Sequence, residues 1–201
     1  MQIILASASE RRKDLLASLG LKFKIIPSKI NEKKLEEKIK DPKKLVLAIA
    51  LAKAEKIKTK VKAKDLLIIS ADTFVLQSKI SGRKRIMGKP SSREEAEEML
   101  KALSNKAHNV LTGLVCIKGK KIRKILEITK VKFRKLTDKQ IKGYLDTGVY
   151  LDRAGAYGIQ DKKCDFVKEF IGSYTNILGL PLEKLIPILK ELGVKTGVKG
   201  N

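Results

Sequence analysis

Apolar positions along this chain follow two spacings, one typical of β-strands and the other of α-helices. The run QIIL at residues 2–5 predicts a strand, and the next apolar positions recur every three or four residues, which predicts a helix from about Glu10 to Leu19. The apolar run LLIIS, inside residues 65–70, is typical of a strand buried on both faces. Strands and helices that follow one another in this way indicate an α/β protein with a mixed central sheet flanked by helices.

Residue pairs that favour a helix N-terminus indicate where later helices begin: Asp41 with Pro42, Ser92 with Glu95, and Thr137 with Gln140. The other elements are expected as strands at 22–26, 108–118 and 121–135, a hairpin at 74–88, and helices at 31–40, from Pro42 onward, at 92–103, 137–148 and 182–192. In the helix from Pro42, four residues are expected near one face: Leu45, Ile49, Ala52 and Lys56.

The length of 201 residues fits a single domain, which we expect to span 1–201. The two extended segments around Gly119 predict a long antiparallel hairpin, a candidate for a second lobe of that domain. Residues 153–181 are punctuated by glycine and follow neither spacing, and 194–201 are expected to form a flexible polar tail.

Composition narrows the class of protein. Hydrophobic residues make up 43% of the chain, enough for a real core, so a disordered basic tail is excluded. No apolar run approaches the roughly 18–20 residues that span a bilayer, and the N-terminus does not resemble a secretory signal, so we expect a cytoplasmic protein. Cys116, Cys164 and His108 are too few and too far apart for a structural zinc site.

The formal net charge of +23 raises the possibility of a nucleic-acid ligand. Two features argue against it as the main ligand: the lysines are spread over the whole chain, and aromatic residues make up only 4%. We therefore expect nucleic acid to bind only nonspecifically. A strongly positive field also attracts small polyanions, which keeps polyphosphates among the candidate ligands.

The clearest candidate anion site is the segment LASASERRKDLL. A strand followed by small residues and a helix N-terminus exposes backbone N–H groups that favour negative charge. Ser7 can add a hydroxyl, and Arg11 and Arg12 lie in the first helical turn, although only eight of the 45 basic residues are arginine. The alternative interpretation is a solvated helix start with ordinary surface arginines. The spacing of a P-loop is absent.

Two carboxylates are candidates for metal binding or proton transfer. Asp72 follows the apolar strand directly, and α/β proteins place functional groups at the C-terminal ends of strands. Its carboxylate can hold Mg²⁺ or accept a proton from water, whereas the alternative is a turn closed by an Asx hydrogen bond. Glu32 is a possible second metal carboxylate, and the polar start of a helix explains it equally well.

Three further side chains are weaker candidates. Lys53 interrupts an apolar helical face, and Lys89 lies in a Gly-Lys-Pro turn, so either can contact phosphate as a point charge. In a chain so rich in lysine, an ordinary surface role is the stronger interpretation for each. Gln160 follows AGAYGI and carries an amide that can donate to and accept from a base edge. Together the candidates favour an enzyme that acts on polyphosphates.

Several fragments, in this order along the chain, carry a family resemblance: LASASERRKDLL, Asn31-Glu32, Ala52-Lys53-Ala54, SADTFV, MGKP, HNVLTG, TKVKF, AGAYGIQ and GSYTNILGLPL. Each fragment is weak alone, but their joint order and spacing are highly specific. The sequence resembles the Maf family of nucleoside triphosphate pyrophosphatases, also called septum formation inhibitors. The resemblance covers nearly the whole chain.

The resemblance implies an α/β fold with a cleft between two lobes, and often a homodimer. It implies hydrolysis between the α and β phosphates of a nucleoside triphosphate, giving a monophosphate and pyrophosphate, with a divalent metal such as Mg²⁺ or Mn²⁺. The matching motifs imply that Ser7, Arg11 and Arg12 bind the triphosphate, with help from Lys53 and Lys89. They also imply that Glu32 and Asp72 bind the metal and activate the attacking water, and that Asp72 is the proton acceptor.

The resemblance also implies a substrate. Ala71-Asp72-Thr73 together with AGAYGIQ is similar to the dTTP/UTP branch, whereas the branch that prefers 7-methyl-GTP differs at both places. Arg11, Thr73 and Gln160 would then select the base, and modified pyrimidine nucleotides are further candidate substrates. The chain departs from the family pattern at three positions: Glu10 replaces the usual Pro, Arg153 the usual Lys of DKAG, and Asp161 the usual Gly after the glutamine.

We therefore expect a metal-dependent dTTP/UTP pyrophosphatase. Two alternatives stay open from the sequence. The first is a non-catalytic regulator of cell division that binds nucleotides or RNA, consistent with the +23 charge. The second is a purine-directed enzyme of the inosine-triphosphate pyrophosphatase class, which shares the general fold.

Overall fold

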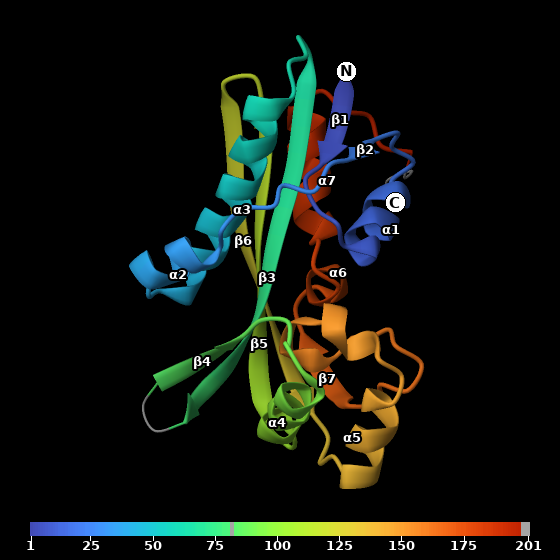
Figure 1. Ribbon diagram of the computed structural model, residues 1–201. Helices are drawn as coiled ribbons and strands as arrows, with labels where there is room; N and C mark the ends of the chain where they lie inside the picture. The colour runs from blue at the N-terminus through green and yellow to red at the C-terminus, as the bar shows by residue number, and fades with distance from the viewer. Residues whose placement is uncertain (81–82, 198–201) are drawn as a thin grey trace. The chain divides into compact units, whose positions relative to one another are not determined.

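The computed structural model describes residues 1–80 and 83–197 (Figure 1). Its strands form one seven-stranded mixed sheet in the order β2-β1-β3-β5-β6-β7, and β4 pairs with β3 outside this path. Helices flank the sheet, which confirms the predicted α/β class. The chain forms two compact units: unit 1 comprises residues 1–72 and 112–127 with the chain from 179 onward, and unit 2 comprises 73–111 and 128–178.

Unit 1 contains β1 (Gln2–Leu5), α1 (Glu10–Ala17), β2 (Lys24–Ile25), α2 (Lys33–Lys38), α3 (Pro42–Lys60) and α7 (Leu182–Glu191). Three strands contribute residues to both units: β3 (Leu66–Ile80), β5 (Ala107–Lys118) and β6 (Lys121–Phe133). Unit 2 adds β4 (Arg83–Met87), α4 (Arg93–Leu103), α5 (Asp138–Leu145), β7 (Val167–Ile171) and α6 (Tyr174–Ile177), with 3-10 helices η1 (Val149–Asp152) and η2 (Ala154–Ala156).

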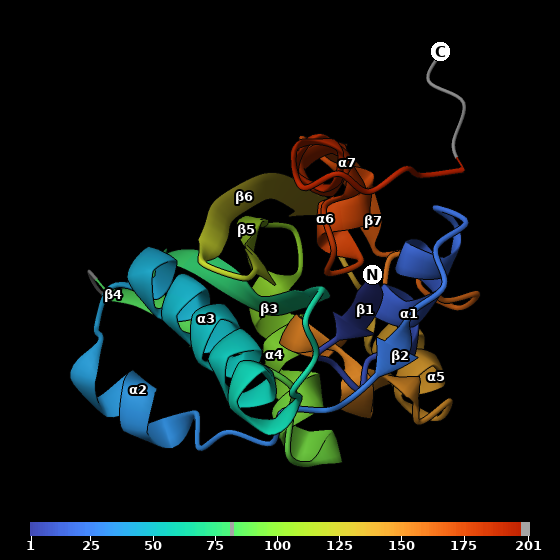
Figure 2. The ribbon, with the colours of Figure 1, turned by 90° about the horizontal axis from the view of Figure 1, so that it is seen from above.

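The parallel strands of unit 1 are covered on both faces. β1 pairs in parallel with β2 and β3, so that Leu5 lies opposite Ile25 and Ile69. Side chains alternate along a strand, so neighbouring residues enter different cores. Leu5 and Ile69 pack with residues of α1 and α7, whereas Ile4 and Ile68 pack with residues of α3. Figure 2 shows α3 and α7 on opposite sides of these strands.

Unit 2 is organised around a buried cluster of aromatic rings that includes Phe133, Tyr144, Tyr157 and Phe166. His108 lies edge-on to Phe133 and Tyr157, and its Nε2 is 2.8 Å from the Tyr157 hydroxyl. Burial lowers the pKa of His108 to about 3, so the imidazole is neutral at physiological pH. His108 is therefore a member of the core.

The predicted helix starts are confirmed by the capping contacts. The side chains of Asp41, Ser92 and Thr137 each accept a backbone N–H of the following helix. Thr137 and Gln140 form a complete capping box. The carboxylate of Glu95 instead accepts from the backbone and hydroxyl of Ser91, so the expected reciprocal bond to Ser92 is replaced by one to its neighbour.

Several predicted boundaries are wrong. The strand expected at 22–26 has two residues, and the helix expected at 31–40 runs only from Lys33 to Lys38. Of the four residues expected near one face of α3, Leu45 and Ile49 are buried, Ala52 is partly buried and Lys56 is exposed. The buried side chains of the helix also include Val46, Ala50, Ala54 and Ile57. A helix packed on a sheet buries a wider stripe than one row of residues, and here that stripe is displaced from Lys56.

Two other differences concern the second half of the chain. β7 lies in the glycine-punctuated segment, where no strand was expected, and pairs antiparallel with β6. In the segment expected to be a polar tail, Val194 is buried and the Gly197 amide donates to Leu19. Residues 198–201 of that segment, and the turn of the 74–88 hairpin at 81–82, lie outside the described residues.

Candidate functional site

Asp72 lies at a different place in its strand than the sequence indicated. β3 does not end after the apolar run but continues to Ile80, because the first strand of the expected hairpin is the same strand. The parallel pairing with β1 does end here, with Leu5 opposite Ile69 and the Ala6 amide donating to Ile69. Asp72 is therefore in mid-strand, just beyond the carboxyl end of the parallel part of the sheet.

Lys53 joins the two candidate carboxylates of unit 1. It projects from α3, and its Nζ donates to Oδ1 of Asp72 at 2.7 Å and lies 2.8 Å from Oε1 of Glu32. The side chains of Asp72 and Lys53 are 10% and 15% exposed, whereas that of Glu32 is 40% exposed. Asp72 therefore does not close an Asx turn, and Lys53 is not an ordinary surface lysine. Together with Glu32 they form one compact cluster.

The second oxygen of Asp72 is available for chemistry. Within residues 1–80 and 83–197, its buried Oδ2 accepts no hydrogen bond. Burial raises the pKa of Asp72 above its ordinary value, and the charges of Lys53 and Arg12 oppose that rise. A buried carboxylate oxygen without a partner is costly unless it meets a proton or a cation. The site can therefore take up either one.

Ser7 and Arg12 form the part of the site that belongs to the turn between β1 and α1. The Ser7 hydroxyl accepts from the Ser9 amide and from the Arg12 guanidinium, each at 3.2 Å. A second edge of that guanidinium donates from Nε to the carbonyl of Gly179 at 2.8 Å. Arg12 is thus held in a fixed orientation, and its charge acts on Asp72. Arg11 is partly buried in the same first helical turn.

Glu10, which replaces the proline usual in the family pattern, pairs within its own helix. Its carboxylate accepts from Lys13 Nζ at 2.8 Å on the exposed side of α1. Lys13 therefore offsets the negative charge that Glu10 adds near the helix start.

The other three candidate residues belong to unit 2. Thr73 is half-buried in β3, Gln160 is exposed in a turn after η2, and exposed Lys89 pairs with Asp152. The Gly155 amide donates to the Gly88 carbonyl at 2.9 Å, which brings the Lys89 turn beside the AGAYGIQ loop. Ser7, Arg11, Arg12, Glu32, Lys53 and Asp72 are thus in unit 1, and Thr73, Lys89 and Gln160 are in unit 2.

The AGAYGIQ loop follows an unusual backbone path. Gly155 and Ala156 both have positive φ, 68° and 62°. A Cβ on Gly155 would lie 2.7 Å from a methyl group of Val75, so only glycine fits there. Ala156 is held in the left-handed region although it has a Cβ, a conformation that surrounding structure must impose. The loop is therefore built to one shape.

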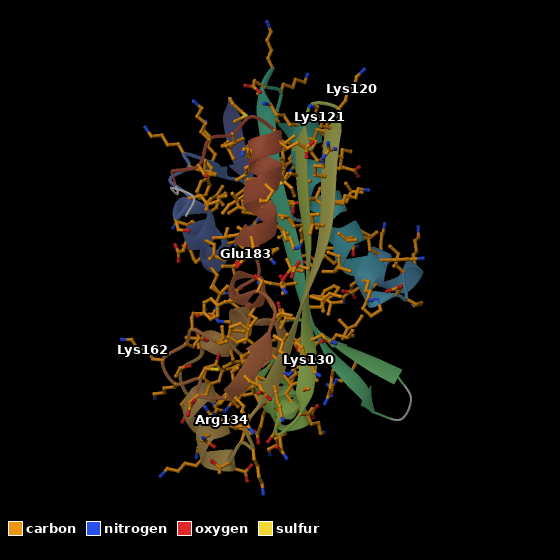
Figure 3. All side chains as sticks on the ribbon, turned by 180° about the vertical axis from the view of Figure 1, so that it is seen from behind. Lys120, Lys121, Lys130, Arg134, Lys162 and Glu183 are labelled. Carbon is orange, nitrogen blue, oxygen red and sulfur yellow. The ribbon has the colours of Figure 1, made fainter. Side chains whose placement is uncertain are left out.

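Positive charge outside the site is carried by both units (Figure 3). Lys120 and Lys121 project at the β5–β6 turn of unit 1, where they help to line a cavity of about 400 Å³, and Lys130 and Lys162 are exposed on unit 2.

No helix within 1–80 and 83–197 is both long and apolar enough to cross a membrane.

Comparison with known proteins identifies the family. The Maf-like protein family matches residues 2–192. The chain belongs to the Maf family. Among curated Maf relatives named dTTP/UTP pyrophosphatase, those of Acetivibrio thermocellus, Clostridium tetani and Pyrococcus furiosus are 43%, 42% and 45% identical to it. Each alignment covers 96% of this chain and 96%, 99% and 96% of the relative, respectively. The predicted family is confirmed.

The structure adds contacts that the Maf motifs alone did not suggest. The Gly179 carbonyl anchors Arg12, and Asp152 pairs with Lys89. Asp161 accepts from both Arg153 and Tyr144. Two of these residues, Arg153 and Asp161, had a signal in the sequence, since both depart from the family pattern. Nothing in the sequence indicated Gly179, because a backbone carbonyl leaves no trace in residue type.

Proposed function

We propose that this protein is a nucleoside triphosphate pyrophosphatase that hydrolyses dTTP and UTP to the monophosphate and pyrophosphate. The names of relatives 42–45% identical over most of the chain support this reaction and favour it over a non-catalytic regulator. The structural observation that carries the proposal is the buried Asp72 carboxylate. Lys53 holds it beside Glu32, the charge of Arg12 acts on it, and its Oδ2 has no partner within the described residues.

The two carboxylates fit a divalent cation. Mg²⁺ is commonly held by one or two carboxylates, with water and substrate phosphate completing its shell. Asp72 Oδ2 is a buried oxygen that lacks a partner among the described residues. The half-exposed Glu32 pairs with the same Lys53 ammonium group as Asp72 does. The described residues contain no group of three or more His, Cys, Asp or Glu that could hold a metal by themselves. We therefore assign Glu32 and Asp72 as ligands of Mg²⁺ or Mn²⁺, which would neutralise charge on the phosphates when bound.

Asp72 is also the proposed proton acceptor for the attacking water. A base works best when its pKa lies near the working pH, and burial moves the pKa of Asp72 in that direction. Oδ1 is occupied by Lys53, so Oδ2 is the atom that receives the proton when the metal is held by Glu32, water and the substrate phosphates. Lys53 keeps the carboxylate oriented and ionised through its positive charge.

The remaining cations bind the triphosphate. Ser7, Arg11 and Arg12 supply donors at the N-terminus of α1, where the helix dipole also favours negative charge. Lys53 and Lys89 assist as point charges. Phosphoryl chemistry depends mainly on such preorganised charge, because the protein itself forms no covalent bond to the phosphate.

Base selection is assigned to Arg11, Thr73 and Gln160. The Gln160 amide offers one donor and one acceptor, which matches the alternating O4 and N3–H edge of uracil and thymine. Modified pyrimidine nucleotides that keep this edge are included among the proposed substrates.

We further propose that the enzyme acts in the cytoplasm as a homodimer.

Pyrophosphate release from a panel of nucleoside triphosphates, with Mg²⁺ or Mn²⁺, tests the proposal. The wild type should hydrolyse dTTP and UTP in preference to purine nucleotides, and chelation of the metal should abolish turnover. Asp72→Asn should reduce kcat about 10²–10⁴-fold while the protein stays folded, because it removes the proton acceptor and keeps the side-chain shape. Full activity of Asp72→Asn, or preference for inosine triphosphate, would refute the assignment.

A further inference from the structure

The turn that carries Gln160 is closed by contacts at both of its ends. The Asp161 amide donates to the Gly158 carbonyl at 2.9 Å, so Gln160 is one of the two central residues of a four-residue turn. The Gly158 amide donates to the Tyr144 hydroxyl at 3.1 Å, and that hydroxyl donates to Oδ2 of Asp161 at 2.7 Å. A single phenol of α5 therefore holds the first and last residues of the turn.

Arg153 binds the same carboxylate through both of its oxygens. Arg153 donates from Nε to Oδ2 of Asp161 at 3.1 Å and from a terminal nitrogen to Oδ1 at 3.0 Å. Such two-pronged pairing constrains orientation as well as distance. The side chains of Arg153 and Asp161 are only 15% and 11% exposed, so the bridge is weakly screened by solvent.

Space around the bridge is tight. A Cβ on Gly158 would lie 2.5 Å from Asp161 Oδ2 and 2.7 Å from Arg153 Nε, so the bridge packs directly against the turn backbone. The same segment reaches Lys89, because Asp152, the neighbour of Arg153, forms the ion pair with that lysine. The bridge thus connects the segment that pairs with Lys89 to the turn that carries Gln160.

We propose that Asp161, bound by Arg153 and Tyr144, is a positioning residue that fixes the Gln160 turn and thereby sets the affinity for the pyrimidine nucleotide. This inference rests on the proposed function, because it assumes that Gln160 contacts the base. Its physical basis is preorganisation: a turn that is ordered before binding avoids the entropy cost of ordering upon binding.

The test compares Asp161→Asn and Tyr144→Phe with a matched control. Both variants keep the side-chain shape and remove part of the bridge. Glu191→Gln makes the same charge change at another two-pronged pair, the exposed Arg123–Glu191 bridge of unit 1. Four quantities are measured for each: amide hydrogen exchange over residues 157–163, KM for UTP, kcat for UTP, and the dissociation constant for UTP in the slowly hydrolysing Asp72→Asn background.

Asp161→Asn and Tyr144→Phe should accelerate exchange at Gly158 and Asp161, because the amides of these two residues carry the hydrogen bonds that close the turn. Both variants should also raise KM and the dissociation constant about three- to tenfold. The value of kcat should change less than twofold, since neither side chain reaches the reacting atoms. The Glu191→Gln control should leave all four quantities unchanged. If the bridge only stabilised the fold, the variants would have lower thermal stability, but KM would not rise while kcat stayed constant.

Unchanged exchange in both variants would overturn the proposal, since the turn would then be fixed by other contacts. Faster exchange with an unchanged dissociation constant would also overturn it, because the turn would then have no part in nucleotide binding. If the wild type hydrolyses neither dTTP nor UTP, the proposed function fails, and the exchange and binding measurements still decide the role of Asp161.

Discussion

Lys53 is the residue that makes two separate carboxylates into one site. It is mostly buried and carries the positive charge nearest to Asp72, and that charge opposes the effect of burial on the Asp72 carboxylate. Removal of one partner from a buried ion pair leaves the other charge buried and unpaired. This costs more free energy than the intact pair contributes to stability. Both activity and stability should therefore depend on the ammonium group.

Lys53→Met should raise the pKa of Asp72 further, because the opposing charge is removed and burial remains. Since Asp72 must be ionised to accept a proton, the acidic limb of the pH–rate profile for UTP hydrolysis should move to higher pH. The free energy of unfolding should fall by about 3 kcal/mol at neutral pH. Lys53→Arg, which keeps the charge, is the control, and an unshifted acidic limb in Lys53→Met would contradict the argument.

His108 should make the stability of the protein depend on pH. Its pKa is about 3 in the folded protein and near 6.5 when unfolded, so between these values the unfolded chain binds a proton that the folded chain does not. The free energy of unfolding should therefore fall as the pH falls from about 6.5 toward 3, by up to about 1.4 kcal/mol per pH unit. Chemical denaturation across this range measures the slope. In His108→Gln, whose amide can still bond to Tyr157, the slope should be shallower by that amount, and equal slopes would show that His108 does not contribute.

At the scale of elements, the position of α3 on the sheet decides where Lys53 lies. Asp41 caps the helix, and Val46, Ile49 and Ala50 on its buried face fix it against the strands. α3 also approaches Gly113 of β5 closely, since a Cβ added there would lie 2.6 Å from the carbonyl oxygen of Val46. This contact involves the backbone of α3, which cannot move aside as a flexible side chain can.

Gly113→Ala should push α3 away from β5 and lower the free energy of unfolding by about 1–3 kcal/mol, as overpacking does elsewhere. Because α3 carries Lys53, UTP hydrolysis should fall as well. Gly143→Ala is the control within α5, where nothing lies within 4 Å of the added methyl group, and it should stabilise the protein by about 0.5–1 kcal/mol. Thermal denaturation of both variants measures the difference, and the same sign for both would contradict the packing argument.

At the scale of the whole molecule, the charge of +23 acts on an anionic substrate before any contact forms. Long-range attraction raises the rate of encounter and is screened by salt, with a Debye length near 10 Å at 0.1 M. The surface lysines therefore have a kinetic role even where they touch no substrate.

The value of kcat/KM for UTP should fall about tenfold between roughly 20 and 300 mM KCl, whereas kcat should change little, because chemistry follows encounter. Replacement of Lys120 and Lys121 by Glu should reduce this salt dependence without change in kcat, since these two lysines of the β5–β6 turn are not among the proposed site residues. Stopped assays at fixed pH measure both quantities. A kcat/KM independent of salt would show that overall charge does not guide the substrate.

Elements with strong local signals could be predicted from the sequence alone. Capping pairs located the starts of α3, α4 and α5, and the apolar run at 65–70 identified a doubly buried strand. These predictions succeeded because a cap or an apolar period acts within a few residues. Residue type also identified Asp72, Glu32, Lys53 and the opening arginines as candidates, and the motif order identified the family.

Which of these groups come into contact depends on the folded arrangement of the whole chain. Lys53 is 19 residues from Asp72 and was only a weak candidate for contact with phosphate, yet it joins Asp72 to Glu32. The continuation of β3 beyond Asp72, the strand β7, and the bridge from Asp161 to Arg153 and Tyr144 likewise depend on partners from other elements. The physical reason is the same in each case: pairing across a sheet and burial of charge depend on what the rest of the chain places nearby, and no local pattern records that.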